Sequence, residues 1–168
     1  MKTKKLTLLA VLMALNIAIS SFFIPVGPNL RIYFTFLISM LVSSMYSYPT
    51  VFIYAAAEDI LSFFIFPSGT FFFGYTLTAI ASMTIYHIFL YKKVTLPRIA
   101  ISKLLVNVLV NMLLGSLWSY ILYSKGYMYY LAKSVVKNLI MCPIEVLLFW
   151  FVYRSISPLI HKYFDQEK

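Results

Sequence analysis

Residues 99–123 read IAISKLLVNVLVNMLLGSLWSYILY, a run of 25 positions with one charged side chain. A helix needs about 20 mainly apolar residues to cross the hydrocarbon core of a bilayer, so this segment is long enough to span a membrane. Small or polar residues recur every four positions along one face of such a helix, at Lys103, Asn107, Asn111 and Gly115. Lipid would reject the two amides, so we expect this stripe to face protein, with Lys103 reaching toward the membrane surface.

The whole chain has the composition of an integral membrane protein. It has 168 residues, of which 62% are hydrophobic and 11% are charged, whereas soluble domains are about 45–50% apolar and about 25% charged. Too few polar residues remain to cover a soluble globule, which excludes a basic nucleic-acid-binding domain, a disordered segment and a secreted disulfide-rich module. Cys142 is the single cysteine, so neither an internal disulfide nor a cysteine metal cluster is available.

Prolines mark the breaks between the apolar runs, because a missing N–H costs least at a helix end. These breaks contain Pro25, Pro28, Pro49, Pro67, Pro97 and Pro158. We predict an all-α integral membrane fold, one domain over residues 1–168, with six transmembrane helices near 6–24, 30–47, 50–66, 71–91, 99–123 and 134–154. Pro143 alone falls inside a predicted helix, where we expect a kink.

The basic residues predict the orientation of the chain. There are 14 Lys and Arg against 5 Asp and Glu, and the basic residues gather at 2–5, at 92–98 and after residue 153. Cytoplasmic segments are rich in Lys and Arg, and six spans return the chain to its starting side. We therefore predict a multi-pass protein of the cell membrane with both termini in the cytoplasm. A signal peptide cleaved near Ser20 is the alternative, but the apolar run continues and further spans follow, which favours a retained first helix.

Ionisable groups at membrane depth are costly, so each one is a candidate for function. Glu58, Asp59 and Glu145 are the acids inside predicted helices, and Arg31 begins the second helix on the outer side. Either an outward-opening ligand site or an ion pair between Arg31 and a neighbouring acid accounts for these charges. Lys137 lies near the outer end of the last helix and adds positive charge, which suits an anionic ligand or lipid headgroups.

Two further patterns concern partners and catalysis. Ala10, Ala14 and Ala18 form a small-residue face on the first helix, which favours close docking of another subunit. The chain has no Walker motif and no Gly-x-Ser-x-Gly motif, and His87 and His161 lie 74 positions apart. We therefore predict no catalytic residues, no metal and no cofactor, and we expect a chain this small to need partners for transport.

Several segments resemble those of folate-specific substrate-binding subunits, the S components of the FolT type, in energy-coupling factor vitamin transporters. They run in order along nearly the whole chain: PNLRIYF at 28–34, EDIL at 58–61, FPSGTF at 66–71, GYTL at 74–77, KLLVN at 103–107, and KNLIMCP at 137–143. The Phe-Pro-Ser-Gly block and the stripe from Asn107 through Asn111 to Trp118 are the most specific parts.

The resemblance implies a protein that binds folate from outside, covers it with outer loops, and docks through Ala10, Ala14 and Ala18. The implied partners are folate, a transmembrane coupling subunit, two ATPase subunits and the lipid bilayer, with no nucleic acid. Folate carboxylates suit a cationic mouth, its pterin N–H groups suit carboxylates or amides, and its rings suit aromatic side chains. The implied ligand contacts are Arg31, Phe34, Asp59, Phe66, Pro67, Ser68, Gly69, Tyr75, Asn107, Asn111, Trp118 and Lys137.

Three other hypotheses stay open. Glu58 beside Asp59 and the bulky segment 62–66 depart from a family pattern rich in Ala and Gly, which favours an S component for a different vitamin. A small membrane enzyme acting on lipid or isoprenoid substrates would use Glu58, Asp59 and Glu145 as acid or base. A purely structural membrane subunit would account for the alanine face.

Overall fold

The computed structural model describes residues 3–27, 30–67, 71–123 and 126–165, and these residues are mainly helical. The elements in chain order are α1 (Thr3–Ser20), β1 (Phe23–Gly27), β2 (Leu30–Tyr33), α2 (Phe36–Met45), α3 (Tyr48–Ile65), α4 (Phe73–Leu90), α5 (Leu96–Leu105), the π-helix η1 (Val106–Leu114), α6 (Gly115–Leu122) and α7 (Tyr127–Asp165). The predicted all-α fold class is confirmed, with one short hairpin added.

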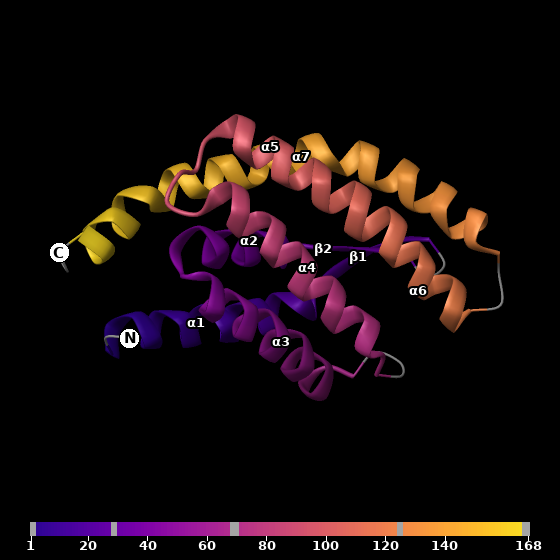
Figure 1. Ribbon diagram of the computed structural model, residues 1–168, viewed down its shortest axis with the longest axis horizontal. Helices are drawn as coiled ribbons and strands as arrows, with labels where there is room; N and C mark the ends of the chain where they lie inside the picture. The colour runs from indigo at the N-terminus through magenta and orange to yellow at the C-terminus, as the bar shows by residue number, and fades with distance from the viewer. Residues whose placement is uncertain (1–2, 28–29, 68–70, 124–125, 166–168) are drawn as a thin grey trace.

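The helices lie roughly side by side along the long axis, and both termini lie at one end of the bundle (Figure 1). We call this end the inner end and the opposite one the outer end. α2 and α4 lie between a side formed by α1 and α3 and a side formed by α5, α6 and α7. α3 and α6 end, and α4 and α7 begin, at the outer end, so the chain crosses the bundle an even number of times.

In the described part of the chain, five helical stretches are long and apolar enough to cross a membrane: Thr3–Ser20, Tyr48–Ile65, Phe73–Leu90, Leu96–Leu122 and Tyr127–Ile160. The apolar helix α2 has ten residues and is too short to cross alone. Strand β2 precedes it, and the two elements together extend over about 28 Å, close to the ~30 Å of a hydrocarbon core. The second crossing in chain order is thus a strand followed by a short helix.

The predicted helices 6–24 and 30–47 are wrong where they approach each other. α1 ends at Ser20, and the chain then forms an antiparallel hairpin in which Phe23 pairs with Tyr33 and Ile24 with Ile32. Hydropathy alone does not separate an extended apolar segment from a helical one. β-Branched and aromatic residues favour the extended form, and hairpin pairing satisfies backbone groups that lipid cannot.

The predicted sixth helix, 134–154, is too short at both ends. α7 begins at Tyr127, continues through Pro143 and Pro158, and ends at Asp165. Pro158 therefore lies inside a helix rather than at a break. Packing keeps the C-terminal part of α7 helical, because Trp150, Tyr153 and Ile160 contact the hydrophobic core. Pro49 and Pro97, in contrast, lie in the first turns of α3 and α5, where proline is favoured.

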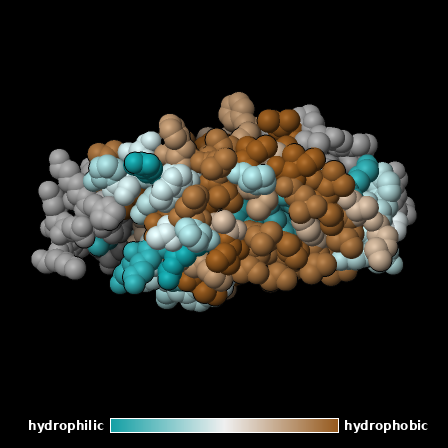
Figure 2. Space-filling view, turned by 90° about the horizontal axis from the view of Figure 1, so that it is seen from above, coloured by the Kyte–Doolittle hydropathy of each residue, from teal (hydrophilic) through white to brown (hydrophobic). Residues whose placement is uncertain are grey.

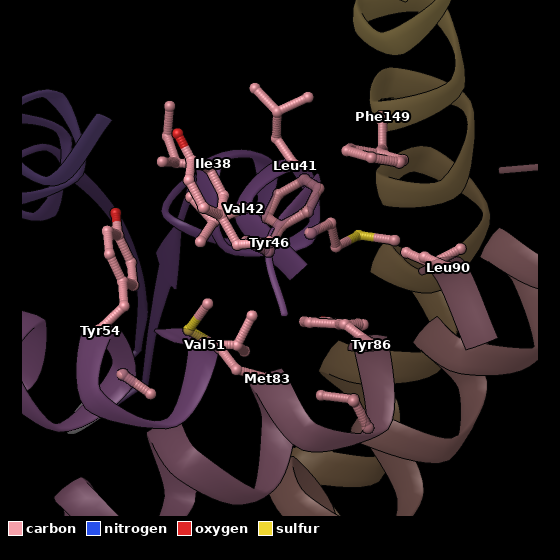
Figure 3. Packing of buried hydrophobic residues seen from close by; sticks show 14 of the residues in the cluster. Ile38, Leu41, Val42, Tyr46, Val51, Tyr54, Met83, Tyr86, Leu90 and Phe149 are labelled. Carbon is pink, nitrogen blue, oxygen red and sulfur yellow. The ribbon is translucent and has the colours of Figure 1, made fainter. Parts of the chain in front are cut away.

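The hydrophobic core joins α2, α3, α4 and α7 in the inner half of the bundle. Figure 3 shows Val42 of α2, and Tyr46 directly after that helix, between Tyr54 on one side and Phe149 on the other. Met83 and Tyr86 of α4 point toward the same cluster. On the outside, Figure 2 shows a broad hydrophobic band across the middle of the visible face, with hydrophilic residues gathered toward both ends. This is the surface that a bilayer requires.

Candidate functional site

A cavity of about 940 Å³ lies inside the bundle, between α2, α3 and α4 on one side and α5 to α7 on the other. Small-molecule pockets have volumes of about 300–1,000 Å³, so this cavity has room for a ligand of vitamin size. Aromatic residues near the outer helix ends form part of its wall, namely Phe66, Phe71, Phe72, Tyr75, Tyr123 and Tyr130. Its polar residues form three groups.

The first group is acidic and lies on α3. Glu58 and Asp59 both line the cavity. The Ser62 hydroxyl donates to Glu58 Oε1 at 3.1 Å, and the Thr76 hydroxyl of α4 donates to Asp59 Oδ2 at 2.6 Å. An ionised carboxylate has about four acceptor positions, so each acid retains capacity for further donors. This wall therefore suits a ligand that presents N–H groups.

The second group connects η1 with α7 and is rich in amides. The Asn111 amide donates to Asn107 Oδ1 at 2.9 Å, and the Ser134 hydroxyl donates to the Asn111 carbonyl at 3.1 Å. Asn138 donates to the Ser134 carbonyl at 2.8 Å and to its hydroxyl at 3.0 Å. Lys137 and, one turn earlier, Lys133 also line the cavity from α7. The predicted polar stripe does face protein, as its amides require.

The third group lies nearer the inner end and contains a buried ion pair. Lys103 Nζ of α5 lies 3.2 Å from Glu145 Oε2 of α7, with side chains 3% and 10% exposed. Nζ also donates to the Tyr86 hydroxyl at 3.4 Å and lies 4.2 Å from the centre of the Phe36 ring. The expectation that Lys103 reaches the membrane surface is therefore wrong, because Glu145, Tyr86 and the ring compensate its charge inside the bundle.

A nine-residue π-helix separates the inner and outer parts of the fifth crossing. The predicted stripe at i,i+4 spacing requires a regular α-helix, but Val106–Leu114 has the wider turn of a π-helix. π-Segments rotate the residues that follow them and are frequent at functional sites. Beyond η1, the cavity wall is formed by Gly115, Ser116, Ser119 and Tyr123, while Trp118 is not among the residues that line it.

Trp118 instead supports the wall from behind. Its indole N–H donates to the Thr78 hydroxyl of α4 at 2.9 Å, and its ring lies 5.4 Å from that of Phe72. Gly74 makes this packing possible, because a Cβ at that position would lie 2.9 Å from the Trp118 ring and even closer to Phe72. Trp118 thus fixes α6 against α4 and orients residues that do line the cavity.

The structure brings one part of the predicted site together at the cavity. Asp59, Phe66, Pro67, Tyr75, Asn111 and Lys137 line it. Phe34 packs against the hydrophobic core, and Asn107 lies behind the wall, where it accepts from Asn111 and donates to Glu145 at 3.5 Å. Ser68 and Gly69 lie outside the described residues, as does the side chain of Arg31, whose backbone belongs to β2.

Several wall residues were not among the predicted contacts. They include Ser39, Ser62, Tyr86, Ser116, Ser134 and Asn138. Isolated serines carry little sequence signal, and Tyr86 is one of 14 tyrosines. Asn138 has a sequence signal, because it is an amide inside a predicted helix directly after Lys137.

The exposed face of α1, which carries the three alanines of the predicted docking face, is separate from the cavity. Ala10, Ala14 and Ala18 are exposed, while Leu12 and Ile17 of the same helix are buried. The described residues contain no group of three His, Cys, Asp or Glu side chains placed to hold a metal ion.

Comparison with known proteins completes the description. No protein-family model matches the chain. A relative from Clostridium novyi named "Folate transporter FolT" is 30% identical over 159 residues, which cover 94% of this chain and 92% of the relative. A protein of the same name from Leuconostoc mesenteroides is 32% identical over 161 residues, covering 91% and 86%. A crystal structure of FolT bound with folic acid has a TM-score of 0.83 and 31% identity, and the match covers 91% of this chain and 94% of that one.

Proposed function

The chain belongs to the FolT family of folate transporters, and from this premise we propose that it is the folate-binding membrane subunit of an uptake system. Proteins of this family are transporters, so the hypotheses of a lipid-modifying enzyme and of a purely structural subunit are set aside. One observation carries the proposal. The bundle contains a cavity of about 940 Å³ with acids on one wall and amides and lysines on another, in a fold shared with FolT bound with folic acid.

The chemistry of folate fits the division of polar groups around the cavity. Its pterin ring presents N–H donors, which Asp59 and Glu58 on α3 accept. Its glutamyl part carries two carboxylates, which attract Lys133 and Lys137 on α7 through charge-assisted hydrogen bonds. The aromatic rings between these ends pack against wall residues such as Tyr75.

Phe66 and Pro67 line the outer part of the cavity just before residues 68–70. We infer that this segment, which includes Ser68 and Gly69, covers the bound vitamin. Arg31, which pairs with Pro25 in the hairpin, supplies a further cation for the glutamyl carboxylates in this proposal. Phe34, Asn107 and Trp118 act from behind the wall, by fixing the residues that touch the ligand.

The distribution of charge supports an orientation with both termini in the cytoplasm of a cell-membrane protein. Both termini lie at the inner end, together with the connection between α4 and α5, which carries Lys92 and Lys93, and the first turn of α5, which carries Arg98. Cytoplasmic segments are enriched in such residues. The outer part of the cavity, whose wall includes Phe66, Tyr75 and Tyr123, then lies toward the outside, where a nutrient is captured.

The sequence contains no Walker motif for ATP binding, so we propose that uptake requires a separate module. This module comprises a transmembrane coupling subunit and two ATPase subunits. The exposed face of α1 with Ala10, Ala14 and Ala18 is the proposed contact, since small residues let another helix approach closely.

Calorimetric titration of the purified chain with folic acid tests the proposal. We expect saturable binding at one site per chain without any partner. A panel of other vitamins, screened by thermal shift, tests the hypothesis of a different ligand. Absence of binding to folic acid together with stabilisation by another vitamin would contradict the proposal and support that alternative.

A further inference from the structure

One fully buried hydroxyl of the cavity wall has no hydrogen-bond partner within the described part of the chain. Ser116 lies in the first turn of α6, is 2% exposed, and lines the cavity. Its Oγ is buried, and no protein atom there donates to it or accepts from it. Buried polar groups are nearly always paired, because an unpaired one loses its hydrogen bonds to water without replacement.

Several other helical serines donate to a carbonyl of the preceding turn. Ser119 donates to the Gly115 carbonyl at 2.8 Å, Ser102 to the Ile99 carbonyl at 3.0 Å, and Ser39 to the Thr35 carbonyl at 3.0 Å. This bond to the preceding turn is the usual solution for serine in an apolar helix. Ser116 departs from it at the junction between the π-helix and α6.

The residue beside Ser116 also belongs to the cavity wall. The preceding residue, Gly115, also lines the cavity and has no side chain. A Cβ built on Gly115 would meet only the Val110 carbonyl, at 3.6 Å, so the space beside Gly115 is open. The start of α6, directly after the π-helix, therefore places a buried, unpaired hydroxyl in the wall of a ligand-sized cavity.

We propose that Ser116 is a specificity residue whose hydroxyl pairs with an uncharged polar atom of the bound ligand. This inference rests on the proposed function and assigns the bond to the pteroyl part of folate, the pterin and aminobenzoyl rings. The wall around Ser116 on α6 provides hydroxyl groups and no cation, whereas the lysines that suit the glutamyl carboxylates belong to α7. A site that pairs with a ligand in this way discriminates against analogues that lack the partner atom.

The test measures the affinity of Ser116→Ala for folic acid and for pteroic acid, which lacks the glutamyl part. We expect both ligands to bind about tenfold more weakly than to the wild type, as loss of one buried hydrogen bond predicts. Ser116→Cys has a side chain of similar size but a weaker hydrogen-bond donor. Its affinity for each ligand should lie between the affinities of the wild type and of Ser116→Ala. Ser102→Ala is the control, because it removes a buried hydroxyl from the same crossing outside the cavity.

A second readout separates a ligand contact from a structural role. Without ligand, Ser116→Ala should melt at the wild-type temperature or slightly above it, because it removes an unpaired polar group. Equal affinities of Ser116→Ala and wild type, a loss seen with folic acid alone, or a clearly lower melting temperature of the unliganded variant would each overturn the inference. If the wild type itself does not bind folic acid, the proposed function is contradicted, and with it the proposed role of Ser116.

Discussion

The ammonium of Lys103 and the carboxylate of Glu145 lie 3.2 Å apart and join α5 to α7 beside the inner part of the cavity. Two opposite charges are tolerated there because each has further partners. Tyr86 and the Phe36 ring contact the ammonium, and the Asn107 amide donates to the carboxylate. The pair therefore forms the polar inner part of the cavity wall and links the helical segments that carry the amide group of residues.

Removal of one partner should destabilise the protein more than removal of both. Glu145→Leu leaves the Lys103 charge buried without its counter-ion, a change that typically costs about 3–5 kcal/mol. Lys103→Met should have a comparable effect, while the double variant should recover most of the loss. Thermal unfolding in detergent measures this cycle. Strictly additive effects of the two substitutions would contradict the coupling.

Neutralising the acidic wall should weaken folate binding. Asp59→Asn removes a charged acceptor for the pterin N–H groups, and hydrogen bonds to charged groups are worth about 1.5–3 kcal/mol, or roughly ten- to a hundredfold in affinity. Calorimetric titration measures the change. Phe64→Leu is the control, because Phe64 lies on the same helix with 73% of its surface exposed. Unchanged affinity of Asp59→Asn would remove this acid from the ligand contacts.

Lys137 should distinguish ligands that carry the glutamyl part from ligands that do not. Lys137→Met is expected to weaken folic acid binding about tenfold and pteroic acid binding less, because pteroic acid has one benzoate carboxylate in place of the two glutamyl carboxylates. Lys93→Met, which removes an exposed positive charge at the inner end, controls for net charge. An equal loss for both ligands would show that Lys137 supports the wall and does not read the carboxylates.

A bulky residue on the outer face of α1 should separate binding from transport. Ala14→Leu is expected to bind folate like the wild type, because Ala14 is exposed and is not part of the cavity wall. Uptake in cells that hold the coupling module should fall several-fold, since the leucine keeps the partner helix at a distance. Ala132→Leu, at an exposed alanine on α7, is the matched control. Normal uptake by Ala14→Leu would place the docking face elsewhere.

The sequence predicted the crossings well because charge and hydropathy act over whole segments. Runs of about 20 apolar residues have few alternatives in a bilayer, and proline marks their ends. The hairpin was missed because Phe23 and Tyr33 belong to apolar runs that suit a strand or a helix equally. The start of α7 was also missed: the predicted helix begins at residue 134, whereas α7 begins seven residues earlier, at Tyr127.

The site was predicted in part, and the reason lies in the π-helix. A regular α-helix would keep Lys103, Asn107, Asn111, Gly115 and Trp118 near one face. The wider turn of Val106–Leu114 leaves Asn111 at the wall, places Asn107 behind it, and turns Ser116 toward the cavity in place of Trp118. Tertiary packing decides where such a segment forms, and periodicity in one sequence does not reveal it.

The central claim is that folate occupies the cavity between α3 and α7, and a structure of the purified chain with folic acid tests it most directly. The account predicts ligand density in this cavity, with pterin N–H groups at Asp59 or Glu58 and the glutamyl carboxylates at the lysines of α7. An empty cavity at a saturating folic acid concentration, or density elsewhere on the bundle, would contradict it.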